Sequence, residues 1–225
     1  MAGHPTIGTA VVLRALGRVG ERTVFELGVG PTPVRVRPGW AEMNQPRPTF
    51  GPEHPAPAAL AEALSIRPED LAGPELPPQG VTTGVPYLLV PVRSLAAMHR
   101  LRPRPDLWEA ALGDFRGHGV YAFSREVERP GSDAHCRMFA PLQGVAEDPA
   151  TGSAAGPLAC YLARRGADTG GTVAFRFEQG LEMGRESLLE ASVDRAGDAI
   201  TAVRVGGAAR IVAEGRLAAE AVGQT

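Results

Sequence analysis

Two short loops carry the side chains best suited to chemistry, and both loops follow one pattern. The run from His4 to Ala10 reads His-Pro-Thr-Ile-Gly-Thr-Ala, and the run from Asp148 to Ala154 reads Asp-Pro-Ala-Thr-Gly-Ser-Ala. The offset is constant, since 148 minus 4 is 144. In each run a polar residue precedes proline, a glycine and a hydroxyl residue follow, and an apolar stretch comes next. The repeat predicts one supersecondary unit present twice, with pseudo-twofold symmetry.

Each loop has the composition of an anion-binding turn at the start of a helix. Glycine lets a ligand approach the backbone, and Thr9 or Ser153 stands at the expected helix entrance. Unpaired N–H groups and about half a positive charge gather there, which favours a carboxylate. Two facing helix starts would clamp a small anion, with His4 and Asp148 on either side as proton-transfer groups. That geometry suits an isomerase, although the same residues are also ordinary capping and turn residues.

The elements that must position these loops are two apolar helices and many short strands. We expect helices over residues 8–16 and 153–165, each ending at a glycine, Gly17 and Gly166. The first is apolar almost all the way round, which predicts burial on all sides. Residues 46–57 are rich in proline and predict a domain boundary. The expected class is α+β, with strands near residues 23–27, 34–37, 87–92, 120–124, 134–139, 172–178, 188–193, 200–205 and 209–214.

Composition removes several classes of function. The chain has 23 basic residues, and every one is arginine. Without lysine, Schiff-base and pyridoxal-phosphate chemistry and the lysine-dependent phosphate loop are excluded. The net charge of -2 is mixed along the chain, so no nucleic-acid partner is expected. There is no apolar run of about 20 residues and no signal sequence, so we expect no membrane partner and a cytoplasmic location.

Cysteines and histidines give no metal-binding pattern in the sequence. Cys136 and Cys160 have no metal-ligand spacing, and we expect both to be free buried thiols. The histidines at positions 54, 99, 118 and 135 are scattered, with no HExxH motif and no close pairing. We therefore assign no metal and expect no cofactor.

Four segments together resemble the PhzF-like proteins of phenazine biosynthesis. They are residues 2–8 (Ala-Gly-His-Pro-Thr-Ile-Gly), 147–154 (Glu-Asp-Pro-Ala-Thr-Gly-Ser-Ala), 178–187 and the closing 205–215. The resemblance covers nearly the whole chain and implies the diaminopimelate-epimerase-like fold. In that fold two pseudo-symmetric domains each wrap strands around a central apolar helix, and the active site lies between them. We expect residues 1–48, completed in part by 207–225, to form the N-terminal domain, and residues 49–206 the second domain.

The resemblance also implies a reaction and a set of site residues. The reaction is a cofactor-independent proton shift on a small, cyclic, hydroxylated carboxylate. His4 and Asp148 would be the catalytic residues, orienting the substrate and stabilising charge as the proton moves. The residues expected to bind the substrate carboxylate or line the pocket are Gly3, Gly152, Ser153, Thr151 and Arg185. Of these, Arg185 follows a tight Met-Gly turn and is equally explained as part of a turn between strands.

Two departures from the family pattern bear on activity. Related cysteine-based racemases place one thiol on each side of the pocket, and neither matching position here holds cysteine, which disfavours a two-thiol mechanism. PhzF-like proteins usually carry strands before the Gly-His-Pro loop, including a glutamate that is the main acid-base, whereas this chain begins at the loop. Our hypothesis is that a truncated or misassigned start disables the usual proton shuttle. The alternative function is a non-catalytic protein that binds small anions. We expect a homodimer.

Overall fold

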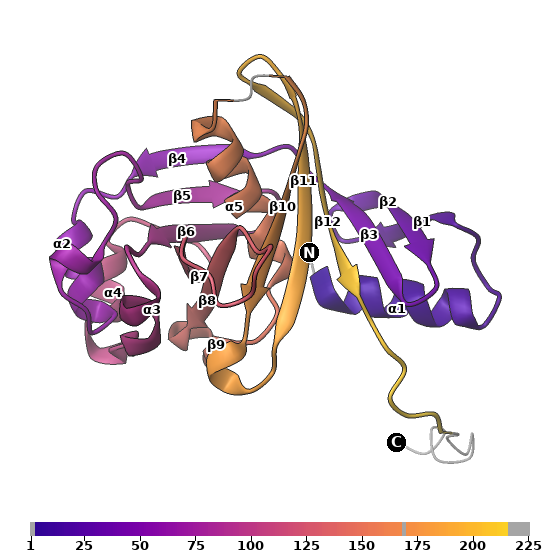
Figure 1. Cartoon of the computed structure of the whole chain (residues 1–225), viewed down its shortest axis with the longest axis horizontal. Helices are drawn as coiled ribbons and strands as arrows, with labels where there is room; N and C mark the ends of the chain where they lie inside the picture. Colours follow the sequence, from indigo (N-terminus) through magenta and orange to yellow (C-terminus); the bar gives the residue numbers. More distant parts are fainter. Residues whose placement is uncertain (1–2, 168–169, 216–225) are drawn as a thin grey trace.

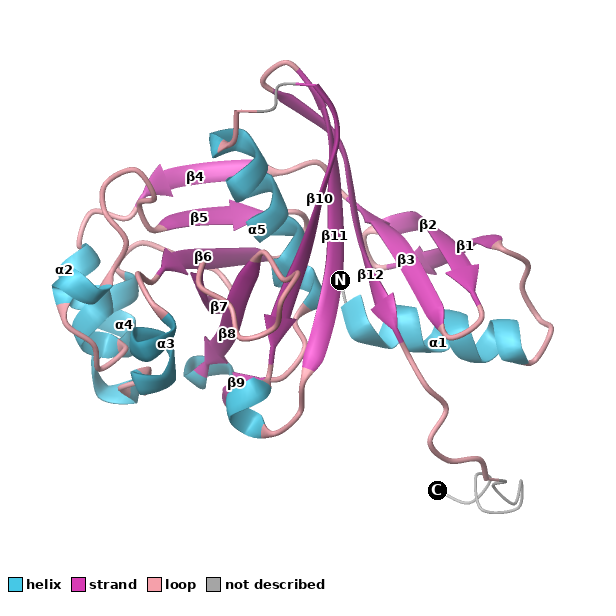
Figure 2. Cartoon of the chain, in the orientation of Figure 1, coloured by secondary structure: helices cyan, strands magenta, loops and turns pink. Residues whose placement is uncertain are grey.

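The computed structural model describes residues 3–167 and 170–215, and it has the expected α+β class (Figures 1 and 2). Its helices are α1 (Gly3–Ala15), α2 (Pro57–Ala63), α3 (Leu95–Arg100), α4 (Pro105–Leu112) and α5 (Gly152–Arg165), with short 3-10 turns η1 (Pro68–Asp70), η2 (Pro141–Gln143) and η3 (Leu181–Met183). Its strands are β1 (Arg22–Leu27), β2 (Gly30–Arg37), β3 (Trp40–Gln45), β4 (Thr49–Glu53), β5 (Gln79–Thr82), β6 (Pro86–Pro91), β7 (Gly119–Ser124), β8 (Ala134–Ala140), β9 (Val145–Asp148), β10 (Gly170–Gln179), β11 (Ser187–Ala196) and β12 (Ala199–Ala208).

One mixed sheet runs through the described part of the chain. Its strand order is β1-β2-β3-β12-β11-β10-β8-β7-β6-β5-β4, and β9 pairs with β8 beside this path. Only β6–β7 and β8–β10 pair in parallel among the described strands. β12 pairs with β11 on one side and with β3 on the other, so it joins the smaller part around α1 to the larger part around α5 (Figure 1). The expected division into domains 1–48 and 49–206 stays a prediction.

Helix α5 is the central helix of the larger part. Its residues from Gly152 to Ala163 are buried except for Ser153, and fully buried side chains such as Leu158 and Tyr161 each stabilise the fold by about 1.5–3 kcal/mol. The helix starts one residue before the predicted position and ends at Gly166 as expected. It continues through Pro157, which removes one intrahelical hydrogen bond without ending the helix.

Helix α1 corrects two expectations. It begins at Gly3 rather than at residue 8, because Pro5 lies within the first helical turn, where proline removes no intrahelical hydrogen bond. The helix is also not buried on all sides. It packs against β2, β3 and β12, while Val12 on another face is 40% exposed, and Leu16, the residue that follows the helix, is 65% exposed.

Two further segments differ from the sequence prediction. The proline-rich boundary contains β4, whose residues pair with β5. The final strand expected over 209–214 is wrong: β12 ends at Ala208, and Val212 is 94% exposed. The neighbouring strand β3 begins at Trp40, opposite Ala208, so the apolar residues beyond have no strand to pair with. Residues 216–225, part of the expected completion of the N-terminal domain, lie outside the described residues.

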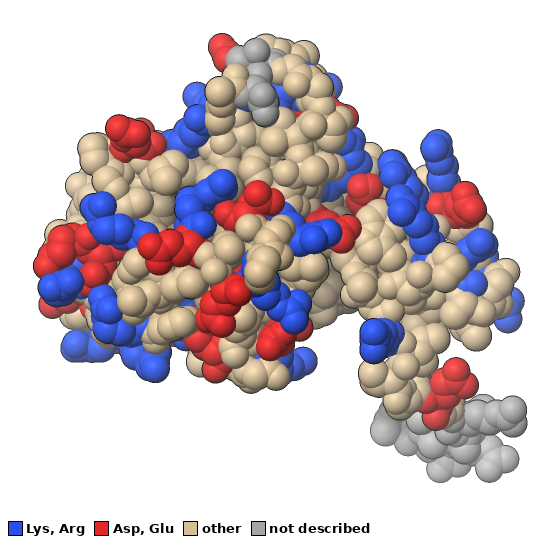
Figure 3. Space-filling model, in the orientation of Figure 1, with Lys and Arg blue, Asp and Glu red and all other residues tan. Residues whose placement is uncertain are grey.

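The remaining helices cover a second core away from α5. Helices α2, α3 and α4 pack on β6 and β7 around Trp108, Leu88 and Phe139, at the left of Figure 1. Arginines and acidic residues are interspersed over the face shown in Figure 3. A search of the described helices for one long and apolar enough to cross a membrane found none.

Candidate active site

The starts of the two repeated helices meet. Gly3 of α1 lies so close to the start of α5 that a Cβ placed on it would be 3.1 Å from both the Gly152 Cα and the Ser153 amide nitrogen. Any side chain larger than hydrogen would push the two helix starts apart, which explains glycine at this position. Because the first amides of each helix have no intrahelical partner, two sets of N–H donors gather in one place.

A cavity of about 540 Å³ lies beside this meeting point. Gly3, His4 and Ile7 line it from α1, and Ala150 and Gly152 line it from the turn that enters α5. The other walls are the start of β11 and its approach (186–190), the end of β12 with the residues after it (205–210), Met43 and Arg129. Arg129 and Arg210 bring positive charge to the cavity, and Arg129 donates a 2.6 Å hydrogen bond to Glu186.

A buried glutamine holds the turn that leads into α5. The amide oxygen of Gln179 accepts from the Thr151 N–H at 3.1 Å and from the Tyr121 hydroxyl at 3.0 Å. Its amide nitrogen donates to the Asp148 carbonyl at 2.6 Å and to the Thr151 hydroxyl oxygen at 2.9 Å. The Thr151 hydroxyl in turn donates to the Asp148 carboxylate. The Asp-Pro-Ala-Thr turn is therefore held at both ends by one side chain.

Two more polar groups position the start of α5. Gln45 of β3 donates to the Gly152 carbonyl at 3.0 Å and accepts from the Thr83 hydroxyl at 2.6 Å. The Gln45 side chain occupies the space where a Cβ on Gly156 would stand, so a larger residue there would displace Gln45 from these two hydrogen bonds. Ser153 and the Tyr87 hydroxyl form a 2.8 Å hydrogen bond, and burial raises the pKa of Tyr87, which keeps it a neutral phenol. The second loop is thus built to a fixed shape.

The comparisons with known proteins agree with this geometry. A family model described as phenazine biosynthesis-like protein, PhzC-PhzF, matches residues 1–215. The chain belongs to the PhzF family.

Several relatives of this chain are named as isomerases, and solved structures share its fold. A trans-2,3-dihydro-3-hydroxyanthranilate isomerase from Pseudomonas aeruginosa is 36% identical over 96% of this chain and 73% of its own length. An uncharacterised isomerase from Mesorhizobium japonicum is 32% identical over 96% of this chain and 75% of its own length. The solved structure of a predicted epimerase from Pseudomonas aeruginosa has a TM-score of 0.74 and 37% identity, and the match covers 95% of this chain and 75% of that one. A PhzF-family structure from Bacillus anthracis has a TM-score of 0.84 at 24% identity, covering 92% and 73%.

The structure separates the predicted site residues of this PhzF-family chain into two groups. Gly3, His4 and Gly152 line the cavity. Asp148 and Thr151 contact each other in the adjoining turn, and Ser153 contacts Tyr87, but none of the three is among the cavity-lining residues. Arg185 is exposed in the segment between η3 and β11 and does not line the cavity either.

Four contributors to the site are not among the residues that the sequence predicts: Arg129, Gln179, Tyr87 and Gln45. Each acts through a partner far along the chain, as Gln179 does with Thr151 28 residues away and Gln45 with Gly152 107 residues away. Repeats and local motifs carry no information on such contacts. The one local sign of Gln179 is its position as a polar residue at the end of an expected strand.

The cysteine prediction is confirmed. Cys136 and Cys160 are both free and buried. Burial raises the pKa of the Cys160 thiol to about 12 and that of Cys136 further still, so neither is a thiolate near neutral pH. The histidines have no close pairing in the sequence, but the structure brings the ring centroids of His99 and His135 to 5.9 Å from each other. The two residues are on different elements, α3 and β8, so sequence spacing could not reveal the contact.

Proposed function

We propose that this PhzF-family chain is a cofactor-independent isomerase that shifts a proton on a small, cyclic, hydroxylated carboxylate. The observation that carries the proposal is the meeting of two helix starts at Gly3 and Gly152 beside a 540 Å³ cavity. The relative from Pseudomonas aeruginosa, 36% identical to this chain, is a trans-2,3-dihydro-3-hydroxyanthranilate isomerase, and relatives from Pseudomonas chlororaphis and Pseudomonas fluorescens, each 34% identical, carry the same name. Their substrate belongs to the class that the cavity would take.

The substrate carboxylate would lie at the paired helix starts. Amide donors and the dipole of each helix favour an anion there. Arg210 and Arg129, the latter paired with Glu186, also line the cavity. Because the donors are already in place, they also stabilise charge that reaches the carboxylate during the reaction without reorganisation.

In the proposed reaction His4 carries the proton. A ring nitrogen of His4 takes a proton from one ring carbon, and the C–H electron pair moves through the conjugated system toward the carboxylate. The proton then returns from His4 to a carbon further along that system, so no atom is gained or lost. Asp148, which accepts from the Thr151 hydroxyl, and Ser153, which contacts Tyr87, would act by holding the start of α5 in place beside the substrate. General acid-base catalysis of this kind contributes about 10²- to 10⁴-fold to a rate.

One specific observation favours a second function, a non-catalytic protein that binds small carboxylates. Both glutamates lining the cavity already have partners in the described structure: Glu186 pairs with Arg129, and Glu190 accepts a 2.9 Å hydrogen bond from Trp40. No free carboxylate base is therefore present among the described lining residues. The two functions share the anion site and differ only in whether His4 moves a proton.

The test is turnover of trans-2,3-dihydro-3-hydroxyanthranilate by the untagged chain in D₂O, followed by proton NMR. We expect isomerisation, with His4→Gln lowering kcat at least about 100-fold while KM changes little. His54→Gln is the matched control, because His54 contacts the Leu112 carbonyl in another part of the fold. Equal turnover by wild type and His4→Gln would refute the assignment of His4. Substrate binding with no turnover would instead establish the carboxylate-binding function.

We also propose that the protein works in the cytoplasm as a homodimer, with a small carboxylate rather than nucleic acid or membrane as its partner. The mixed surface charge in Figure 3 and the two unpaired cysteines support this environment. Val24 on β1, the edge strand of the described sheet, and Val12 on α1 are exposed apolar side chains, which supports self-association. Light scattering coupled to size-exclusion chromatography tests the dimer, and a monomer at micromolar concentration would contradict it.

A further inference from the structure

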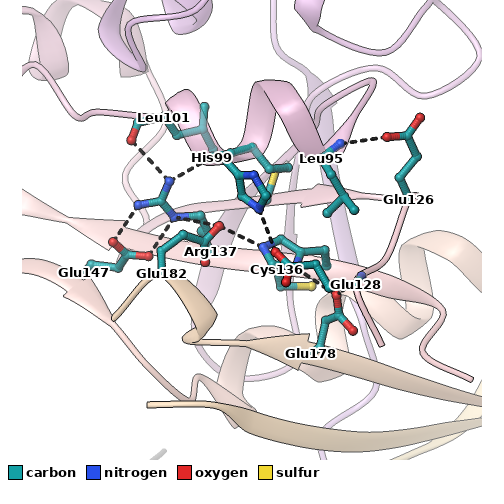
Figure 4. A network of polar contacts seen from close by, with 12 residues as sticks. Leu95, His99, Leu101, Glu126, Glu128, Cys136, Arg137, Glu147, Glu178 and Glu182 are labelled. Carbon is teal, nitrogen blue, oxygen red and sulfur yellow. Dashed lines mark hydrogen bonds and ion pairs between the residues drawn. The ribbon is translucent and has the colours of Figure 1, made fainter. Parts of the chain in front are cut away.

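A cluster of two histidines and three glutamates lies outside the candidate active site, where four separate segments and a 3-10 turn converge (Figure 4). Its members are His99 of α3, Glu128 of the connection after β7, His135 of β8, Glu178 of β10 and Glu182 of η3. One ligand atom from each of His99, Glu128 and His135 lies within 4.8 Å of the other two. His135 and Glu178 have fully buried side chains, whereas those of His99 and Glu128 are 47% and 38% exposed.

Glu178 holds the main chain at Glu128 and the imidazole ring of His135 in place. Its carboxylate accepts from the backbone N–H of Glu128 at 2.7 Å and of Arg129 at 3.0 Å, and it lies 2.9 Å from His135 Nδ1. A carboxylate ion has no hydrogen to donate, so His135 Nδ1 carries the proton of that contact. The same carboxylate thus anchors the backbone that bears Glu128 and sets the tautomer of His135.

The second ring nitrogen of His135, Nε2, needs a proton or a metal ion between it and Glu182. In a neutral ring with its proton on Nδ1, the Nε2 atom is a lone-pair donor. It lies 2.9 Å from Glu182 Oε1, which is also a lone-pair donor. Two such atoms repel at this distance unless a proton or a metal ion stands between them.

Glu182 itself is only partly satisfied. Its second oxygen, Oε2, is buried without a hydrogen-bond partner among the described residues. The nearest positive side chain, Arg137, approaches Glu182 Oε1 at 3.7 Å, but its guanidinium is engaged by the Glu147 carboxylate through two bonds of 2.8 Å. A buried carboxylate oxygen without a partner is costly, and a metal ion would satisfy it.

We propose that His99, Glu128 and His135, with Glu182 next to His135, form a binding site for a divalent transition-metal ion of the zinc class. Imidazole nitrogens and carboxylate oxygens are the donors such ions use. Tetrahedral ligand bonds of about 2.0–2.1 Å place neighbouring ligand atoms about 3.3–3.4 Å apart. The contacts of 2.9 Å (His135–Glu182) and 2.7 Å (His99–Glu128) would widen by about half an ångström to reach that spacing, and the ligand atoms of His99, Glu128 and His135, which lie within 4.8 Å of one another, would close to it.

The surroundings have the organisation of a metal site. Glu178 behind His135 reproduces the carboxylate–histidine–metal arrangement that orients a ligand ring. The exposed sides of His99 and Glu128 provide an entry path from solvent. A single ion would tie α3, the Glu128 segment, β8 and η3 together, and the next residue after Glu128, Arg129, lines the cavity. We therefore assign the ion a structural role in holding that cavity wall.

The experiment is a zinc titration of the untagged full chain, stripped with EDTA and desalted, in competition with a chromophoric zinc chelator. We expect one zinc ion per chain and at least about 100-fold weaker binding by the double variant His99→Gln, Glu128→Gln. Both side chains are exposed, so the double variant should fold, and far-ultraviolet circular dichroism checks this. Glu126→Gln is the matched control, because Glu126 lies in the same connection but accepts from the Leu95 amide.

X-ray absorption at the zinc edge supplies a second, independent measurement. Two imidazoles and oxygen ligands at about 2.0–2.1 Å would support the assignment. The proposal is overturned if wild type binds zinc no more tightly than the double variant, or if the bound zinc has fewer than two imidazole ligands. Neither readout depends on isomerase activity, so its failure would leave the proposed function untouched.

Discussion

Gln179 offers the sharpest test of how the second loop is held. Its side chain is fully buried and makes four hydrogen bonds, to the Thr151 amide and hydroxyl, the Tyr121 hydroxyl and the Asp148 carbonyl. Gln179→Met keeps the length of the side chain and removes all four. The Thr151 amide, the Tyr121 hydroxyl and the Asp148 carbonyl would then lose this partner.

The expected cost follows from those three groups. Each buried polar group left unsatisfied costs about 1–3 kcal/mol. Because Asp148 is only partly buried, water can replace part of the loss, and we expect a decrease of about 3 kcal/mol in the free energy of unfolding. That is a large fraction of the 5–15 kcal/mol typical of a folded domain. Turnover should fall as well, because the turn that enters α5 is no longer fixed.

Urea denaturation followed by circular dichroism measures this loss as a shift of midpoint at constant slope. Gln143→Met is the matched control, since Gln143 is exposed and should change stability by less than about 0.5 kcal/mol. Gln179→Glu separates hydrogen bonding from packing, because it keeps the size and acceptor but removes both amide donors, and it should also be destabilised. A loss for Gln179→Met no larger than that of the control would refute the reasoning.

Two further perturbations test the close approach of the helix starts and the charge balance of the fold. Gly3→Ala would place a methyl group 3.1 Å from the start of α5. We expect the free energy of unfolding, measured by urea denaturation, to fall by about 1–3 kcal/mol, and KM to rise because the substrate binds more weakly. An unchanged KM would count against the candidate site. Hydrogen bonding with Arg67 lowers the pKa of Asp70 to about 2 from an ordinary 3.8. Since a lowered pKa stabilises the fold above the ordinary value, the stability advantage of wild type over Asp70→Asn should be full above pH 4 and shrink toward pH 2; an advantage independent of pH would contradict this.

The parts of the fold that were predictable are those with a local signature. Helix α5 was placed within one residue because its apolar run has a Gly-Ser entrance and a glycine at its end. The predicted start of α1, residue 8, lies five residues after the observed start at Gly3, because Pro5 is typical both of a loop and of a first helical turn. The strand expected over 209–214 failed because a strand needs a partner, and the pairing strand β3 ends its ladder at Trp40.

The candidate site also has a part that the sequence predicts and a part that it does not. The glycines and His4 could be predicted because a repeated motif encodes them, and the structure gathers Gly3, His4 and Gly152 around one cavity. The groups that hold the motif in place could not, since Gln45, Gln179 and the pair His99–His135 acquire their roles through contacts that the chain makes only after folding. Such contacts leave no periodicity and no fixed spacing in the sequence.

The position of β12 between β3 and β11 has a mechanical consequence. The small and large parts are joined by main-chain hydrogen bonds along both edges of one strand, rather than by a linker alone. Rotation of one part against the other would have to break those bonds, so any tightening around a bound molecule must come from twisting of the shared strands. Loss of either part should likewise expose an edge of β12, and the chain should therefore unfold as one cooperative unit.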